Sequence, residues 1–550
     1  MKSTDRRRKR RAPAFRYGSE SLEVRTLLAA DFGDAPSGYP VRLADDGARH
    51  ETPAVITQVW QRLGDDIDGE APEDRSGNSV SLSADGNTVA IGAIGNDDNG
   101  TNNGHTRIYR WDSGTSAWGQ LGGDIDGEVL GHWSGCSVSL SADGNTVAIG
   151  AILNDGNDST NTNRGHTRIY RWNSGTSTWD QLGGAGTGDI DGEAAGDHSG
   201  GSVSLSADGN TVAIGARQND GDASFGHTQR GHTRIYRYDG TAWRQLGGAG
   251  TGDIDGEATW DYSGHSVSLS ADGNTVAIGA NFNAGDDITD TRRGHTRIYR
   301  FDGTAWAQLG GAGTGDIDGE AAGDFSGHSV SLSADGNTVA IGANFNAGDD
   351  ITDTKRGHTR IYRFDGTAWA QLGGAGTGDI NGEAPEDFSG RSVSLSADGN
   401  TVAIGANFND GDESTDTKRG HTRIYRYNGT AWVQLGGAGT GDIDGEATSD
   451  ESGWAVSLSA DGNTVAIGAH YNDGVNGQDS GHTRIYHLVD DPLRLGATRD
   501  VEPTGVPSIA ADGDGDDEDG LSWPAILVAG DTYQIPVDLQ GGSGSGNLDA

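Results

Sequence analysis

Several features that would restrict the fold are scarce in this sequence. Cys136 is the only cysteine among 550 residues, so an intrachain disulfide is excluded. No stretch approaches the roughly 20 consecutive apolar residues that a membrane-spanning helix requires. No window sustains the apolar periodicity of an amphipathic helix. A disulfide-stapled fold, a helical membrane span and a helical bundle are therefore not expected.

Positive charge is also scarce, since the formal net charge is −42. Nine of the 39 Lys and Arg residues lie among the first 30 residues, next to only three acids. The chain beyond residue 30 therefore carries an even larger negative excess. Such a surface repels nucleic acid and anionic lipid, and it favours cations or basic partners.

What the sequence has in abundance is repetition. The phrase Ser-Leu-Ser-Ala-Asp-Gly-Asn-Thr-Val-Ala-Ile-Gly-Ala occurs seven times, each time followed by Gly-His-Thr-Arg-Ile-Tyr. The residues that precede the seven copies are Val80, Val138, Val203, Val267, Val330, Val393 and Val456. This regular spacing indicates one supersecondary unit stacked repeatedly. Near-identical units rarely build a unique catalytic centre, so the repeat argues against an enzyme.

The fourth copy shows the pattern of a single unit. Ser266–Ser270 alternates apolar and polar residues, and a tight Ala-Asp-Gly-Asn turn leads to the β-branched run Thr275–Ala280. His295–Phe301 and Thr304–Leu309 predict a third and a fourth strand. Four strands in each of seven units predict an all-β, seven-bladed β-propeller.

The ends of the array predict how the ring closes. The last unit stops at Tyr486 and lacks its fourth strand, whereas an unmatched copy of that strand, Trp60–Gly64, precedes the first unit. We therefore expect the N-terminal strand to complete the last blade and to remove an exposed sheet edge.

Two short motifs resemble those of a known repeat family. Ser263-Gly264 and Ile278-Gly279-Ala280 stand where FG-GAP repeats of integrin α-chain propellers have Phe-Gly and Gly-Ala-Pro, and the strand order resembles that of WD-repeat blades. The calcium loop of the integrin-type repeat is reduced here to Ala-Asp-Gly-Asn. We therefore expect Asp272 to cap its own turn rather than to bind calcium.

Acidic residues gather in the loop that enters each unit, in the pattern Asp-x-Asp-Gly-Glu. Calcium takes several oxygen ligands, so these loops are candidate calcium sites. The candidates are Asp66, Asp68, Glu70, Asp124, Asp126, Glu128, Asp189, Asp191, Glu193, Asp253, Asp255, Glu257, Asp316, Asp318, Glu320, Asp442, Asp444 and Glu446. The sixth copy reads Asp379, Asn381 and Glu383. The alternative interpretation is that these residues are solvated acids of a turn.

Three residue types recur once in each unit, and each has a structural interpretation. Seven copies of the Gly-His-Thr-Arg-Ile-Tyr histidine cannot converge on one metal ion, so we expect structural hydrogen bonding. The arginine of the same phrase is expected to pair with acids of its own or the neighbouring blade. Tryptophans such as Trp306 are expected to pack on the outer strand rather than to stack on sugars.

The chain outside the repeats is expected to form three further parts. Residues 1–30 are a basic segment, predicted to be disordered, in which Leu22–Ala30 resembles the LEPR-XLL segment of large bacterial surface proteins with Val24 in place of proline. A basic tail without a targeting role is the alternative. Residues 31–50 resemble the opening of a DFGDAP/GEVED-type module. The motifs that normally follow this opening occur only after the repeats, at Leu495–Pro503 and Asp516–Gly520. We therefore expect a propeller of residues 55–489 inserted into a split module, whose second part, residues 490–550, begins a β-sandwich that breaks off.

These observations favour a non-enzymatic binding or adhesion protein, extracellular or on the cell surface. The acidic loop face of a monomeric propeller would contact a protein or glycan ligand, with calcium as the one candidate cofactor. Two alternatives stay open. One is a propeller enzyme that cleaves polysaccharide as a hydrolase or lyase, and the other is a passive spacer in a large surface protein.

Overall fold

Five short β-strands recur seven times in the region that the computed structural model describes. This region is residues 58–490, except for residues 98–100, 157–162, 221–228, 249–251, 285–291, 312, 314, 348–354, 375, 411–417 and 437–440. The predicted N-terminal segment, both parts of the split module and the β-sandwich lie outside the described residues.

The described strands form seven antiparallel sheets. The innermost strands are β3 (Ser76–Leu82), β8 (Ser134–Leu140), β13 (Ser202–Leu205), β18 (Ser266–Leu269), β23 (Ser329–Leu332), β28 (Ser392–Leu395) and β33 (Ala455–Leu458). The second strands are β4 (Thr88–Ala93), β9 (Thr146–Ala151), β14 (Thr211–Ala216), β19 (Thr275–Ala280), β24 (Thr338–Ala343), β29 (Thr401–Ala406) and β34 (Thr464–Ala469). The third strands are β5 (His105–Asp112), β10 (His166–Asn173), β15 (His232–Tyr238), β20 (His295–Phe301), β25 (His358–Phe364), β30 (His421–Tyr427) and β35 (His482–Asp490).

Two sets of short strands share the outer edge of each sheet. The fourth strands are β6 (Ala117–Gln120), β11 (Thr178–Gln181), β16 (Trp243–Gln245), β21 (Trp306–Gln308), β26 (Trp369–Gln371), β31 (Trp432–Gln434) and β1 (Gln58–Arg62). The two-residue strands β7 (Ile125–Asp126), β12 (Ile190–Asp191), β17 (Ile254–Asp255), β22 (Ile317–Asp318), β27 (Ile380–Asn381), β32 (Ile443–Asp444) and β2 (Ile67–Asp68) also pair with the third strand. This fifth strand was not predicted, because a two-residue segment has no periodicity to reveal it.

The blades follow the predicted pattern. In the fourth blade β19 is buried at every position, as a central strand should be. Asp272 accepts hydrogen bonds from the Ser270 hydroxyl at 2.6 Å and from the Asn274 amide at 2.9 Å. The expectation that Asp272 caps its own turn is therefore confirmed. The fourth strand is shorter than predicted, running from Trp306 to Gln308.

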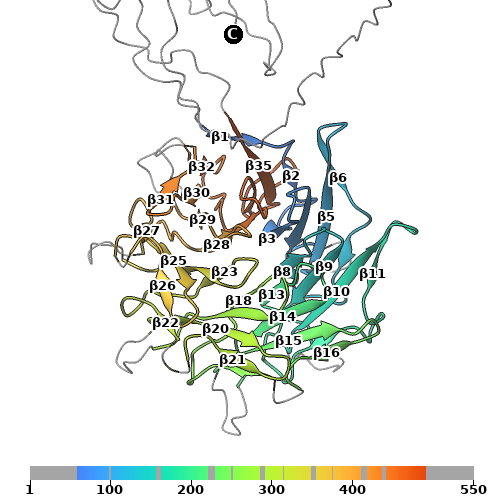
Figure 1. The fold of residues 1–550 in the computed structure, drawn as a ribbon. Helices are drawn as coiled ribbons and strands as arrows, with labels where there is room; N and C mark the ends of the chain where they lie inside the picture. The colour runs from blue at the N-terminus through green and yellow to red at the C-terminus, as the bar shows by residue number, and fades with distance from the viewer. Residues whose placement is uncertain are drawn as a thin grey trace, which may run out of the picture. The chain divides into compact units, whose positions relative to one another are not determined.

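The N-terminal strand closes the ring as predicted (Figure 1). Strand β1 pairs antiparallel with β35, with Trp60 opposite Leu488 and Arg62 opposite Tyr486. Trp60 also packs against the hydrophobic cluster between the sixth and seventh blades, beside Leu435 and Tyr486. The first and last blades are thus joined by a sheet rather than left as two exposed edges.

The innermost strands are connected from blade to blade by hydrogen bonds. The Leu140 amide donates to the Ser81 hydroxyl at 2.9 Å, and the same bond recurs at all seven junctions. The turn alanines add a second closed circle, in which each amide donates to the next carbonyl at 2.9 Å, through Ala84, Ala142, Ala207, Ala271, Ala334, Ala397 and Ala460. These two sets of bonds provide hydrogen-bond partners for backbone amides and carbonyls at the inner edge of each sheet.

The glycines of the two FG-GAP-like motifs meet at each blade junction. The Cα of Gly150 lies against the backbone of Gly200, and a Cβ added at Gly150 would approach the Gly200 carbonyl far closer than 3.0 Å. Gly279 is placed in the same way against Gly327. Side chains are excluded here because two backbones touch, which explains why both positions are glycine in every copy.

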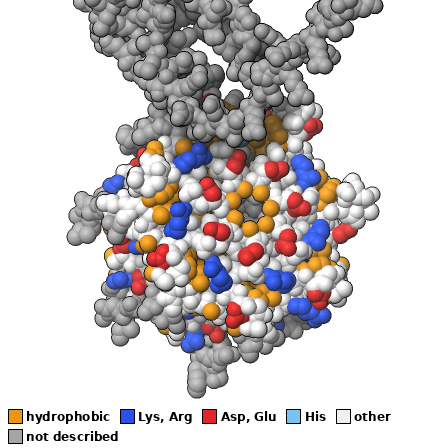
Figure 2. All heavy atoms as spheres, viewed as in Figure 1, with side chains coloured by type: hydrophobic (Ala, Val, Ile, Leu, Met, Phe, Trp, Pro, Cys, Tyr) orange, Lys and Arg blue, Asp and Glu red, His pale blue; other side chains and the backbone are white. Residues whose placement is uncertain are grey.

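One face of the ring surrounds a central opening edged by hydrophobic side chains, with acidic and basic side chains interspersed around it (Figure 2). In the described part of the chain, no helix has the length and apolar character needed to cross a membrane.

Candidate functional site

Two kinds of loop emerge on the same side of the propeller, which we call the loop face. They are the entry loops and the loops between the second and third strands. The described ends of these loops lie together, since Gly294 at the end of one such loop bridges to Ser326 of the next entry loop. The tight Ala-Asp-Gly-Asn and Asp-Gly turns lie at the opposite ends of the strands.

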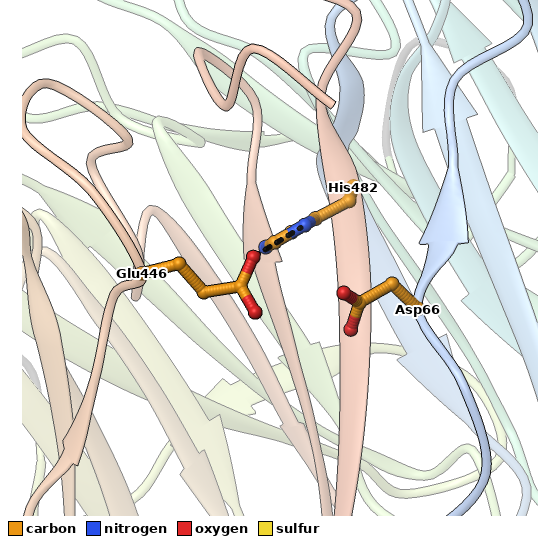
Figure 3. Close-up of side chains that lie close together, drawn as sticks. All are labelled: Asp66, Glu446 and His482. Carbon is orange, nitrogen blue, oxygen red and sulfur yellow. Dashed lines mark ion pairs between the residues drawn. The ribbon is translucent and has the colours of Figure 1, made fainter. Parts of the chain in front are cut away.

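The entry-loop acids meet the repeated histidine and arginine at each blade junction. In the fourth blade, Glu257 lies 3.9 Å from His295 Nδ1 and 3.6 Å from Arg297 Nη1. Asp316 joins this cluster, with one donor atom from each of Glu257, His295 and Asp316 within 4.8 Å of the others. Figure 3 shows another copy, in which Glu446 and Asp66 approach His482 from two different segments.

The three acids of one entry loop therefore do not serve one site. Asp253 joins Glu193 and His232 in one cluster, whereas Glu257 belongs to the next. The backbone carbonyl of Asp255 accepts a bond from Arg297 Nη2 at 2.6 Å. Asn381 in the sixth copy keeps this backbone contact, since its carbonyl accepts from Arg423 Nη2 at 2.7 Å.

The repeated arginine pairs across the blade junction, as predicted. In all seven blades its Nη1 lies 3.5–3.8 Å from the entry-loop glutamate. The histidine is buried, but its Nδ1 is 3.7–3.9 Å from that glutamate, which is longer than the hydrogen bond that was expected. Burial lowers the pKa of His295 to about 3, so this imidazole is neutral at physiological pH.

The donor set of these clusters fits calcium poorly. Calcium prefers six to eight oxygen ligands, whereas each cluster offers two carboxylates and an imidazole nitrogen. A guanidinium also already compensates the glutamate charge. Burial raises the pKa of Glu257, and Arg297 opposes that shift, as expected for a carboxylate held in an ion pair. These contacts favour the alternative to calcium binding by the entry loops, and a comparison of two salts tests between the two interpretations.

We expect calcium chloride and sodium chloride of matched ionic strength to raise the melting temperature equally. Both salts screen the repulsion within a chain of net charge −42, and the arginines leave little demand for a bound cation. Thermal denaturation of the full chain in each salt measures this. A larger shift with millimolar calcium, reduced when Asp253, Asp255 and Glu257 are replaced together by Asn, Asn and Gln, would instead establish the calcium sites.

One set of acids escaped the sequence analysis. Six aspartates four residues after the entry-loop glutamate are almost fully buried, namely Asp74, Asp197, Asp261, Asp324, Asp387 and Asp450. Asp261 accepts bonds from the backbone amides of Glu257 and Ala258 and so holds the entry loop in place. The repeated Glu-x-x-x-Asp spacing was the signal that could have revealed them.

The blades differ from one another at the centre of the loop face, in what we call the axial ring. It comprises the residue after each Ser-Gly pair and the residue after each Ile-Gly-Ala phrase. The first set is Asn78, Cys136, Gly201, His265, His328, Arg391 and Trp454, and the second is Ile94, Ile152, Arg217, Asn281, Asn344, Asn407 and His470. Neighbouring blades bring these side chains together, since His265 and His328 have ring centroids 4.8 Å apart.

An arc of aromatic side chains also crosses the fourth to sixth blades. Consecutive ring centroids lie 4.6–5.0 Å apart from Tyr262 through Phe282, Phe325, Phe345 and Phe388 to Phe408. Cations lie over several of these rings, for example Lys418 Nζ at 4.7 Å from the Phe408 centroid. Trp260 adjoins the arc beside Tyr262 and is 52% exposed.

Two segments of the chain match the family model of the FG-GAP repeat. They are residues 67–109 and residues 443–486. Each matched segment begins at the two-residue Ile-Asp strand and ends in the third strand of the following blade, so it includes the entry loop except for the part that precedes this strand. The matches and the seven-bladed fold support the resemblance to FG-GAP propellers. A comparison with curated proteins found no match.

Proposed function

We propose that this protein is a non-enzymatic binding protein, extracellular or on the cell surface, that holds a protein or glycan ligand on its loop face. The observation that carries the proposal is the contrast between constant and varied positions. The tight turns read Ala-Asp-Gly-Asn in all seven blades, whereas the residues after Ser-Gly are of six different types. A repeated scaffold with one varied surface provides a unique site for recognition.

The aromatic arc is a second reason to assign ligand binding to the loop face. Exposed tryptophan and tyrosine supply much of the binding energy in protein interfaces. A cation held over an aromatic ring adds an electrostatic attraction. Trp260 is among the exposed large apolar residues of the described chain, and it lies on this face. FG-GAP repeats are typical of extracellular domains, which favours a location outside the cell.

An enzyme acting on polysaccharide receives less support from these residues. Glycoside hydrolysis uses two carboxylates that flank the scissile bond. The fourteen residues of the axial ring contain no carboxylate. The passive spacer would not require a varied, aromatic surface on one face.

A binding screen with the full chain tests the proposed function. Glycan arrays and pull-downs from cell-surface extracts are expected to identify a ligand that Trp260→Ala binds at least tenfold more weakly. Val433, which is 49% exposed on β31 at the outer edge of its blade, provides the matched control. Val433→Ala should bind as the unaltered chain does. Equal binding by both variants, or no ligand at all, would contradict recognition by the loop face.

A further inference from the structure

The axial ring has a charge opposite to that of the protein around it. The chain carries 81 acids and 39 Lys and Arg residues, yet none of the fourteen ring residues is acidic. Two of them are arginines, Arg217 from the third blade and Arg391 from the sixth. Both residues are half-buried, so each keeps part of its surface in contact with solvent.

Contacts within the ring hold Arg391 in one place. Its Nη1 lies 2.6 Å from Nε2 of His328, which must therefore be the acceptor and carry no charge. Its guanidinium lies 3.8 Å from the ring centroid of Trp454. Burial is the main cause that lowers the pKa of His265 to about 3, and Arg217 and Arg391 add to it. The two histidines are thus neutral and do not compete for an anion.

The arginines of the ring lack the acids that other arginines of this protein have. The repeated arginines each have a glutamate at 3.5–3.8 Å. Among the described residues, neither Arg217 nor Arg391 has a carboxylate oxygen within 4.0 Å. Glu451 stabilises the charge of Arg391 from farther away, while burial and Arg217 lower the pKa of Arg391 to about 10. The positive charges of Arg217 and Arg391 thus act on one another and on His265 between them in the sequence, with Glu451 as the one acid that stabilises Arg391.

The axial ring also contains unpartnered polar atoms. Oδ1 of Asn344, Oδ1 of Asn407 and Nδ1 of His470 have no hydrogen-bond partner among the described residues. Their side chains are 2%, 2% and 3% exposed, respectively. An unsatisfied buried acceptor is costly, so these atoms favour a ligand that brings hydroxyl donors as well as an anionic group.

We propose that the axial ring binds the anionic group of an acidic carbohydrate, with Arg217 and Arg391 contacting its carboxylate or sulfate oxygens. The planar guanidinium suits such oxygens because it donates two parallel hydrogen bonds. The unpartnered amide oxygens accept the sugar hydroxyls. This inference rests on the proposed function and names the ligand class of the same face.

Isothermal titration calorimetry of the full chain tests the inference. Sodium glucuronate, sodium sulfate and glucose are titrated at an ionic strength held constant with sodium chloride. Glucuronate is expected to bind, sulfate to bind more weakly because it lacks hydroxyl groups, and glucose not to bind. Sulfate binding as tight as glucuronate would show a site for a free anion, and would overturn the carbohydrate assignment. No binding of either anion would overturn the site itself.

Substitutions of the two ring arginines test where glucuronate binds. Arg217→Gln and Arg391→Gln should each weaken glucuronate binding at least tenfold. Arg244, whose side chain is 70% exposed on β16, is the control, and Arg244→Gln should bind normally. If Arg391→Gln fails to fold, Arg217→Gln decides alone, because no described hydrogen bond or ion pair holds its side chain. Unchanged binding in Arg217→Gln overturns the proposal.

The same variants separate this inference from the proposed function. A macromolecular ligand that depends on Trp260 but not on Arg217 leaves the proposed function standing and contradicts the inference. Glucuronate binding that depends on Arg217, without any captured macromolecule, supports the axial site and contradicts the proposed function.

Discussion

Replacing Gly150 by alanine is expected to destabilise the protein by about 3 kcal/mol, at the upper end of the usual cost of overpacking. Gly150 is a β9 residue whose backbone lies against Gly200 of the next blade. An alanine Cβ would overlap the Gly200 carbonyl and the Ser137 hydroxyl. Because the first of these atoms belongs to the backbone, no change of rotamer relieves the overlap. The two blades must move apart, and the neighbouring inner-strand hydrogen bonds are strained with them.

Gly123 provides the matched control, because a Cβ there would meet nothing within 4 Å. Gly123→Ala removes only unfolded-state flexibility, so it should be neutral or stabilise by up to about 1 kcal/mol. Urea denaturation of both variants, followed by circular dichroism, measures the difference. Similar stabilities for the two variants would show that the blade junction tolerates a side chain, contrary to the structure.

Deleting residues 58–63 should have the largest effect of all, and we expect loss of the cooperative native melting transition. The deletion removes β1 and exposes the edge of β35, along which five residue pairs are formed. It also removes Trp60 and Leu63 from two hydrophobic clusters. The Trp118 indole loses its 2.8 Å bond to the Leu63 carbonyl as well. A ring opened at this seam cannot keep its first and last blades together.

Point substitutions test the same β1–β35 closure with a smaller change to the protein. Trp60→Ala should cost as much stability as Trp306→Ala, because Trp306 holds the equivalent position in a blade that is continuous in sequence. Differential scanning calorimetry of the deletion and of the two substitutions gives the comparison. An unaltered transition after the deletion, or a Trp60→Ala variant that is fully stable, would show that β1 does not close the propeller.

The repeat itself predicted most of the fold. Copies of a 13-residue phrase give the same local pattern seven times, and the alternation in Ser266–Ser270 and the turn at Asp272 were sufficient to place strands within one or two residues. Closure was predictable as well, because a fourth strand was missing after Tyr486 and present at Trp60. Local propensity and counting were enough for these features.

The candidate site was predictable only in part. The sequence marked the entry-loop acids, yet Asp253 and Glu257 of one loop serve two successive junctions in the structure. Proximity along the chain suggested a shared site, but the loop runs from the edge of one blade to the centre of the next. The pairing of the repeated arginine with acids was predicted correctly, because acids greatly outnumber Lys and Arg in this chain and an arginine therefore has an acid nearby.

The sequence by itself therefore determined the repeating strands, their number and the closure, because each of these depends on short-range patterns copied seven times. Only the tertiary structure decided which residues meet at the axis. Arg217 and Arg391 are 174 positions apart in the sequence, and neither belongs to a recurring phrase. Their charges act on one another because a closed ring of seven blades brings the start of each innermost strand and the end of each second strand to one axis, where residues that vary along the chain lie near each other in space.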